Sequence, residues 1–428
     1  MGEKVAVVLS GAAARGAFQA GALAVLVPAI EAQGHRVRIF LGTSAGSINA
    51  ALWGANLQLG AEAAGAAVCQ TWRQMDRADV FAHPAGTIAL SRTPQFLLSL
   101  LGQGGAPSGL LDTAPLRRTA ERELDTERLA ANIADGTVDA VGVTATRMPP
   151  RDLAAAVYDD ELSNADLGSL TGDELELSPA FSRSVVFVDS ATLPVDRIAD
   201  PSRAVDVAKG SITVDQVLAS AAIPLGFPPV LVATPADARG WYIDGGVRLN
   251  TPLRPALALG ADRVVVVAGM STEFGRQLPP GGPGDPIPTM ADAAAQLMHA
   301  TMADRMAEDI RTLRSRNALV EQARAAGTSL TRSGGEAMRT IPLLTVSPRP
   351  GELGALAEEV LLRQTRSVAG KLRESDTLLL DRLLRGMGDG PGRRELLSYV
   401  FFDSEYFSAQ IELGAAAARD ALAQGWEA

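Results

Sequence analysis

The sequence predicts an α/β protein with a mostly parallel sheet, because a strand, a tight glycine turn and a helix occur in that order twice within the first sixty residues. The run 4–9 is a predicted buried strand, and the helix 17–32 follows it. The run 37–41 ends at a glycine, and a second helix follows over 45–57. The β-branched run 263–268 is typical of a strand that is covered on both faces.

The remaining elements follow from apolar runs and helical periodicity. We expect strands at 140–146, 184–188, 230–233 and 341–346, and helices at 113–129, 214–222 and 290–325. The Pro- and Gly-rich stretch 276–288 is interpreted as a surface insertion, because a strand-like run returns after it. We therefore expect one catalytic domain over 1–350, with an insertion at about 271–289, and a helical segment over 351–428 packed on it.

Composition excludes some classes of function. The 428 residues carry a net charge of −10, and the pI is about 5.0. This charge argues against nucleic-acid binding and against electrostatic docking on anionic lipid. A lipid-handling protein of this charge is expected to approach membranes through an apolar patch.

Cysteine use and the amino terminus bear on the compartment. The single cysteine, Cys69, cannot form an intramolecular disulfide and is expected to be a small buried apolar residue. We find no signal-peptide pattern, and the apolar runs at 20–30 and 96–101 are shorter than the ~20 residues that span a bilayer. We expect a cytoplasmic protein, with signal-less secretion left open.

The motif G-x-S-x-G at 42–46 lies where a predicted strand meets a helix. A nucleophilic serine needs a strained turn that projects its hydroxyl, and Gly42 and Gly46 remove side chains that would clash there. The N–H group of Ala45, at the start of the helix, is placed to donate to an oxyanion. Ser44 is therefore the candidate nucleophile, and a glycine-lined turn with a capping serine is the alternative.

A second loop of small residues, S-G-A-A-A-R-G at 10–16, also joins a strand to a helix. A dinucleotide fingerprint fails because Ala13 replaces its second glycine. A phosphate loop fails because Ala17 follows Gly16. The loop still offers backbone N–H groups to an anion, which we interpret as the oxyanion of an ester intermediate.

The candidate base is Asp244, which follows an apolar strand end and precedes Gly245 and Gly246. A turn aspartate shows the same pattern. The histidines His35 and His83 lie in predicted turns or loops, which leaves His299 as the one triad candidate downstream of Asp244.

The mid-helix position of His299 is unsuited to a catalytic triad, so a Ser–Asp dyad is the preferred interpretation. An aspartate can act as the base if it is buried and contacts the serine hydroxyl directly. A conventional triad that uses His299 is left open.

Four blocks of sequence resemble the signature blocks of patatin-like phospholipases, in the same order: SGAAARGAFQAGAL, GTSAGSINAAL, ASAAIPLGFPPV and IDGGVRLNTP. The segment FFDSEYFSAQIELG is similar to the family's closing segment. The resemblance implies a three-layer α/β/α fold, a Ser–Asp dyad and no metal or other cofactor. It also implies a lipid or phospholipid substrate and acyl hydrolase activity of the phospholipase A or lysophospholipase type.

Carried over residue by residue, the resemblance makes Ser44 the nucleophile and Asp244 the dyad base. It places Gly11, Ala12 and Ala13 on the oxyanion loop and Arg15 on its basic position. The family usually has glycine at positions 12 and 13. A Cβ atom at positive φ costs about 1 kcal/mol or more, so a non-catalytic lipid-binding member is an alternative.

An apolar stretch at 96–101, followed by the Gly-rich loop 102–109, is a candidate lid for the acyl chain, and a buried helix is the alternative. Head group, acyl length and oligomeric state are not specified by the sequence.

Overall fold

The computed structural model describes residues 2–82, 109, 111–149, 182–272, 282, 285–331, 337–365 and 384–427. The predicted lid at 96–101 and most of the predicted insertion at 271–289 lie outside the described residues.

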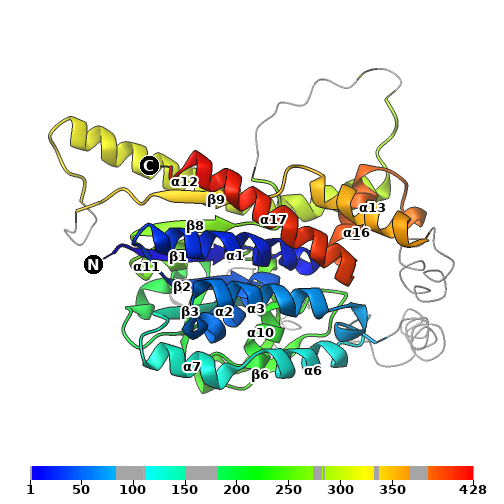
Figure 1. Ribbon diagram of the computed structural model, residues 1–428, viewed down its shortest axis with the longest axis horizontal. Coiled ribbons are helices and arrows are strands. Elements are labelled where there is room, and N and C mark those ends of the chain that lie inside the picture. The colour runs from blue at the N-terminus through cyan, green and yellow to red at the C-terminus, as the bar shows by residue number, and fades with distance from the viewer. Residues whose placement is uncertain are drawn as a thin grey trace, which may run out of the picture.

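Within the described residues, nine strands form a single sheet (Figure 1). They are β1 (Lys4–Leu9), β2 (Arg36–Thr43), β3 (Ala140–Arg147), β4 (Arg183–Asp189), β5 (Val205–Lys209), β6 (Val230–Val232), β7 (Gly240–Asp244), β8 (Arg263–Val267) and β9 (Leu343–Val346). The main path is β5-β4-β3-β2-β1-β8-β9, while β7 pairs with β3 and β6 pairs with β7. Five of these eight strand pairs are parallel, which confirms the mostly parallel sheet.

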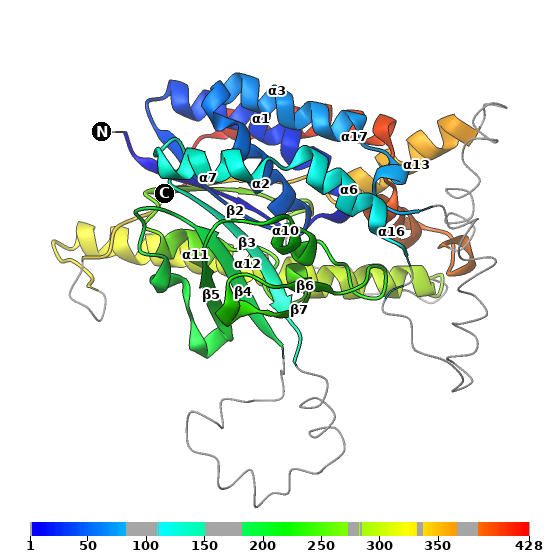
Figure 2. The same cartoon turned by 90° about the horizontal axis from the view of Figure 1, so that it is seen from below.

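Helices cover both faces of the sheet (Figure 2). They are α1 (Gly16–Ala32), α2 (Ala45–Asn56), α3 (Ala61–Gln74), α6 (Ala114–Glu123), α7 (Thr126–Ala134), α10 (Val214–Ser220), α11 (Leu253–Ala258), α12 (Met290–Ala325), α13 (Glu352–Thr365), α16 (Pro391–Val400) and α17 (Ser404–Gln424).

The alternation of side chains along β1 separates two cores. Val5, Val7 and Leu9 pack in one core with residues of α1, α2, α3, α7 and α17. Ala6 and Val8 pack in the other with residues of α11 and α12. The three-layer α/β/α fold is therefore confirmed.

One local expectation was wrong, and one strand was missed. The helix predicted over 113–129 is two helices, because Leu124 is extended and the Asp125 side chain accepts a hydrogen bond from the N–H of Arg128 to begin α7. The strand β5 was not predicted, because this five-residue segment contains two charged residues, Asp206 and Lys209, and has no continuous apolar run. Asp206 forms an ion pair with Arg183 on the neighbouring strand, at 2.7 Å.

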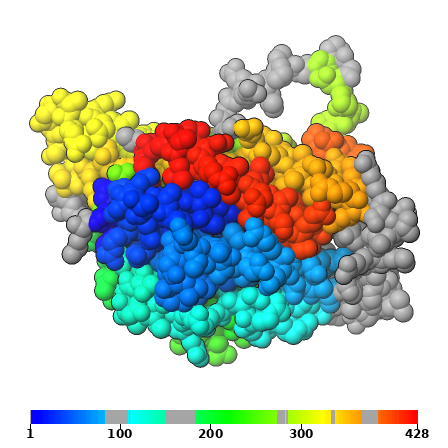
Figure 3. Space-filling model, viewed as in Figure 1, coloured from blue at the N-terminus to red at the C-terminus, as the bar shows by residue number. Residues whose placement is uncertain are grey.

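The last helix of the described chain, α17, packs along α1 (Figure 3). The two backbones approach so closely that a Cβ atom at Gly21 would lie 2.1 Å from the carbonyl oxygen of Ile411. A Cβ atom at Gly414 would lie 2.0 Å from the carbonyl oxygen of Phe18. Glycine is required at both crossing points.

The segment Ala13–Ala32 is long and apolar enough to span a membrane, so the expectation that every apolar run is too short was wrong. In this fold, 72% of its most apolar window is buried inside the protein. Its hydropathy therefore follows from its place as a core helix between the sheet and α17.

Candidate active site

Ser44 occupies a strained turn between β2 and α2. Its φ of 56° and ψ of −127° place a non-glycine residue at positive φ. A Cβ atom at Gly42 would lie 2.1 Å from the carbonyl oxygen of Gly46, and one at Gly46 would lie 2.6 Å from that of Leu9. The turn can therefore form only with both glycines, as the sequence predicted.

Strand β3 brings Ser44 and Asp244 together. Thr43, the last residue of β2, pairs with Thr144 of β3, and Asp244, the last residue of β7, pairs with the next residue, Ala145. The two strands therefore lie along the same edge of β3, and their last residues meet end to end. The Ser44 Oγ donates a hydrogen bond to Oδ2 of Asp244 at 2.6 Å, and both side chains are buried.

The second carboxylate oxygen of Asp244 holds the turn that follows it. Its Oδ1 accepts a hydrogen bond from the N–H of Gly246 at 2.7 Å. A Cβ atom at Gly245 would lie 2.2 Å from the carbonyl oxygen of Thr144, so glycine is needed there as well. Both readings of the sequence therefore apply to Asp244: it is a turn aspartate through one oxygen and faces the serine through the other.

Burial sets the basicity of Asp244. Removal from water raises the pKa of this carboxyl to about 6, against the lowering effect of the hydrogen bonds from Ser44 and Gly246. The group is mostly ionised at neutral pH, yet it is a stronger base than an ordinary aspartate. This is the property that a dyad without histidine requires.

The loop 10–16 lies against Ser44, since a Cβ atom at Gly11 would be 3.5 Å from the Cβ of Ser44. The N–H of Gly11 donates to the carbonyl oxygen of Asn250 at 3.0 Å, so it is not free to act as the predicted oxyanion donor. Within the described residues, the N–H groups of Ala12, Ala13 and Ala45 have no protein acceptor. Ala13 has a φ of 49°, so it is the residue of this loop at which a Cβ atom strains the backbone, as the sequence analysis expected for position 12 or 13.

Arg15 forms a buried network with α16. Its guanidinium makes an ion pair with Oε1 of Glu395 at 2.7 Å and lies 3.7 Å from the centre of the Tyr399 ring. It also donates to Oγ of Ser398 and to the carbonyl oxygen of Gly269. Arg15 therefore ties the loop 10–16 to α16.

Gly16, the other supporting residue predicted in this loop, permits a close approach of α1 to α3. A Cβ atom there would lie 2.5 Å from the ring of Trp72 and 2.9 Å from the Cβ of Ala45.

His299 belongs to the Arg15 network. Its Nε2 lies 3.2 Å from Oε1 of Glu395, and neither Ser44 nor Asp244 bonds to it. Burial alone would raise the pKa of Glu395, but the hydrogen bond from His299 and the charge of Arg15 lower it to about 2. The predicted Ser–His–Asp alternative is thus not assembled.

Of the two other histidines, the structure describes only His35. His35 lies 3.4 Å from Glu3, and His83 lies outside the described residues. Cys69 is buried in α3, and burial raises the pKa of its thiol to about 11, so it is not a competing nucleophile at neutral pH.

Sequence reasoning missed Ser220, at the end of α10. Its Oγ accepts a hydrogen bond from the N–H of Ser44 at 2.8 Å and donates to the carbonyl oxygen of Thr144 at 2.6 Å. It also contacts Oγ of Ser47 at 2.6 Å. The only signal in the sequence was that Ser220 belongs to the block ASAAIPLGFPPV, and the sequence analysis assigned no function to the residues of that block.

Comparison with known proteins identifies the family of the chain. The family model for patatin-like phospholipases matches residues 7–257, more than half of the chain. The chain therefore belongs to the patatin-like phospholipase family, a family of lipid acyl hydrolases. Among solved structures it is similar to VipD from Legionella pneumophila, with 10% identity, a TM-score of 0.27, and coverage of 98% of this chain and 88% of that chain. No curated protein matches the chain.

Proposed function

We propose that the chain hydrolyses fatty-acyl esters of lipids, as a phospholipase A or lysophospholipase, with Ser44 as nucleophile and Asp244 as base. The observation that carries the proposal is the 2.6 Å hydrogen bond from the Ser44 hydroxyl to a buried carboxylate, made on a strained strand-to-helix turn. A buried serine hydroxyl gains nucleophilic strength when the adjacent base takes its proton.

The reaction runs in two halves. Asp244 accepts the Ser44 proton while Oγ attacks the ester carbonyl, and the leaving alkoxide then takes that proton from Asp244 as the acyl-enzyme forms. Water next loses a proton to Asp244 and attacks the acyl carbonyl. The proton returns to Ser44 as the fatty acid leaves, so both residues end as they began.

The oxyanion donors in this mechanism are the N–H groups of Ala12, Ala13 and Ala45. Ala13 is held at positive φ by its neighbours: the N–H of Arg15 donates to the carbonyl oxygen of Ala12 at 2.9 Å, and Gln410 donates to that of Ala14, also at 2.9 Å. Backbone strain at Ala13, which these hydrogen bonds maintain next to Ser44, supports a catalytic role for the loop. Removing one such donor typically costs ~10²–10³ in rate.

An exposed apolar group on the elements that carry Asp244 supports a lipid substrate. Leu231 and Trp241 face each other across β6 and β7, with exposed fractions of 39% and 55%. Leu225, in the loop after α10, is 84% exposed. An aromatic residue beside aliphatic ones suits transient contact with a membrane surface, and it lets an acidic protein dock without electrostatic attraction.

The test is hydrolysis of a medium-chain p-nitrophenyl ester by the wild-type chain and by Ser44→Ala and Asp244→Asn. We expect turnover by the wild type and none above background in either variant, while the controls Ser408→Ala and Asp237→Asn keep full activity. His299→Ala is also expected to keep it. Activity in Ser44→Ala would show that the nucleophile is misassigned. A folded wild type that binds lipid without turnover would favour the non-catalytic alternative.

A further inference from the structure

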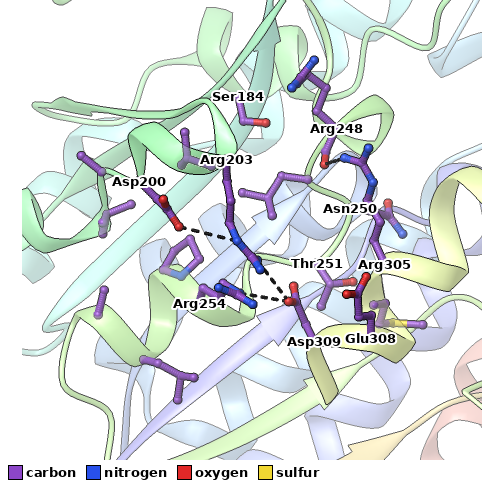
Figure 4. Close-up of a pocket in the computed structure, with 18 of the residues that line it drawn as sticks. Ser184, Asp200, Arg203, Arg248, Asn250, Thr251, Arg254, Arg305, Glu308 and Asp309 are labelled. Carbon is purple, nitrogen blue, oxygen red and sulfur yellow. Dashed lines mark hydrogen bonds and ion pairs between the residues drawn. The ribbon is translucent and has the colours of Figure 1, made fainter. Parts of the chain in front are cut away.

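A cleft of about 570 Å³ lies beside the active site, where the loop after β7 meets α11 and α12 (Figure 4). Its wall includes Arg248, Asn250 and Thr251 from that loop, Arg254 from α11 and Arg305 from α12. The mechanism proposed above uses none of these side chains.

The lining of the cleft is basic in an otherwise acidic protein. Five arginines and three carboxylates line it, a surplus of two positive charges (5 − 3). The carboxylate of Asp309 pairs with Arg254 at 3.0 Å and with Arg203 at 3.5 Å, and Asp200 lies 3.7 Å from Arg203 (Figure 4). These pairs occupy one side of the cleft.

Arg248 and Arg305 are the arginines of this lining that can bind an added anion. Within the described residues, neither guanidinium is within ion-pair distance of a carboxylate, although the exposed Glu308 also lines the cleft. Arg305 donates to the carbonyl oxygen of Arg248 at 2.6 Å, which holds the two side chains at one end of the cleft. Burial and the charges of Arg305 and Arg183 lower the pKa of Arg248, as expected for a cation among cations.

Unpartnered polar atoms gather in the same place. Nε of Arg248 and Oγ1 of Thr251 are buried without a hydrogen-bond partner, and both residues line the cleft. Oδ1 of Asn250 is also unpartnered, but it lies against Gly11 and Gly246, on the side of the dyad. Thr251 and Asn250 are only 3% and 2% exposed. Buried polar groups in proteins nearly always have partners, so this concentration indicates a missing ligand. The Arg248 Nε–H and the Thr251 hydroxyl can both donate to an anion.

We propose that this cleft binds a phosphate group through Arg248, Arg305 and Thr251, and that the phosphate is supplied by the head group of the lipid substrate or by free phosphate. Arginine presents planar N–H donors that match phosphate oxygens, and a threonine hydroxyl adds a further donor. The choice of the lipid head group rests on the proposed hydrolase function.

The chain connects this cleft directly to the dyad. Arg248 follows Asp244 by four residues, which sets an upper limit of about 14 Å between their Cα atoms. Its N–H donates to the carbonyl oxygen of Gly245 at 3.1 Å. The carbonyl oxygen of Asn250 accepts the N–H of Gly11, beside Ser44. A long arginine side chain and a glycerol backbone can bridge such a distance, which favours the lipid head group as the source.

Binding is tested in the full-length Ser44→Ala chain, so that turnover does not interfere. Calorimetric titrations use inorganic phosphate, dihexanoylphosphatidic acid below its micellar concentration, and dihexanoylglycerol as the neutral counterpart. We expect dihexanoylphosphatidic acid to bind, and binding to weaken about tenfold or more when Arg248→Gln or Arg305→Gln is added. Arg324→Gln, an exposed change of the same charge on α12, should leave binding unchanged.

The titrations separate the possible outcomes. Tighter binding of phosphatidic acid than of inorganic phosphate identifies a head-group site, while equal binding identifies a site for free phosphate. The proposal is overturned if the Ser44→Ala chain binds none of these ligands, or if Arg305→Gln and Arg324→Gln bind phosphatidic acid equally well. Because Arg305 is exposed, its replacement should not disturb folding, so weaker binding can be assigned to the lost charge. Ester turnover by the wild type tests the hydrolase function separately, so either idea can fail alone.

Discussion

Replacing Asp244 by Asn should make the protein more stable at neutral pH while it abolishes catalysis. Folding raises the pKa of this carboxyl from 3.8 to about 6, because burial disfavours its charged form. The folded state therefore binds the proton more tightly than the unfolded state does. Between about pH 4 and pH 6 the unfolded chain ionises first, and the stability of the wild type falls as pH rises.

The size of the effect follows from the two pKa values. A tenfold change in acidity corresponds to about 1.4 kcal/mol, so the buried carboxylate costs the folded state about 3 kcal/mol above pH 6 and nothing below about pH 4. Asn cannot ionise, so Asp244→Asn removes this cost. Any hydrogen bond that the amide makes less well adds a constant that does not vary with pH.

The measurement is urea unfolding of the wild type and Asp244→Asn, followed by circular dichroism at several pH values between about 4 and 8. The free energy of unfolding of the variant, relative to the wild type, should rise by about 3 kcal/mol across this range. The exposed Asp237→Asn serves as the control for a lost surface charge. A difference between variant and wild type that stays constant with pH would refute the argument that burial of this carboxyl opposes folding.

Three further predictions follow from the site. The kcat/KM for a soluble ester should be level above about pH 6 and fall about tenfold for each pH unit below it, because only ionised Asp244 can accept the serine proton; a pH–rate profile that is flat down to pH 5 would contradict this. Glu395→Gln should lower the free energy of unfolding by about 3 kcal/mol or more, since it leaves buried Arg15 without its carboxylate, and an unchanged urea midpoint would show that the pair is not a buried one. Ala13→Gly should be about 1 kcal/mol more stable than Ala12→Gly by the same method, because only position 13 has positive φ; equal stabilities would mean that the loop is not strained.

The sequence was sufficient for the elements that local pattern determines. The strand, glycine turn and helix around Ser44 are each specified by consecutive residues, and so is the turn after Asp244. That the two residues meet was predicted from chemistry, because a serine nucleophile needs a base and none of the three histidines was suitably placed. The structure shows the physical reason, which is the pairing of both strand ends with adjacent residues of β3.

Contacts between distant segments could not be predicted in this way. Arg15 was recognised as a basic position, but its partner Glu395 is 380 residues away, and nothing local to either residue identifies the pair. Ser220 has the same difficulty, since a serine at the end of a helix is common and only the tertiary fold places it under Ser44. The engaged N–H of Gly11 likewise depends on Asn250, which the sequence analysis gave no role.

The contacts of the loop 10–16 with α16 and α17 impose an order in time on the assembly of the site. The ribosome makes Ser44 and Asp244 well before Glu395 and Gln410, which anchor Arg15 and the carbonyl oxygen of Ala14. A growing or truncated chain therefore carries the dyad without the anchors that hold the loop in its strained shape. In the proposed mechanism, lipid hydrolysis therefore has to wait until α17 has been made and packed against the loop.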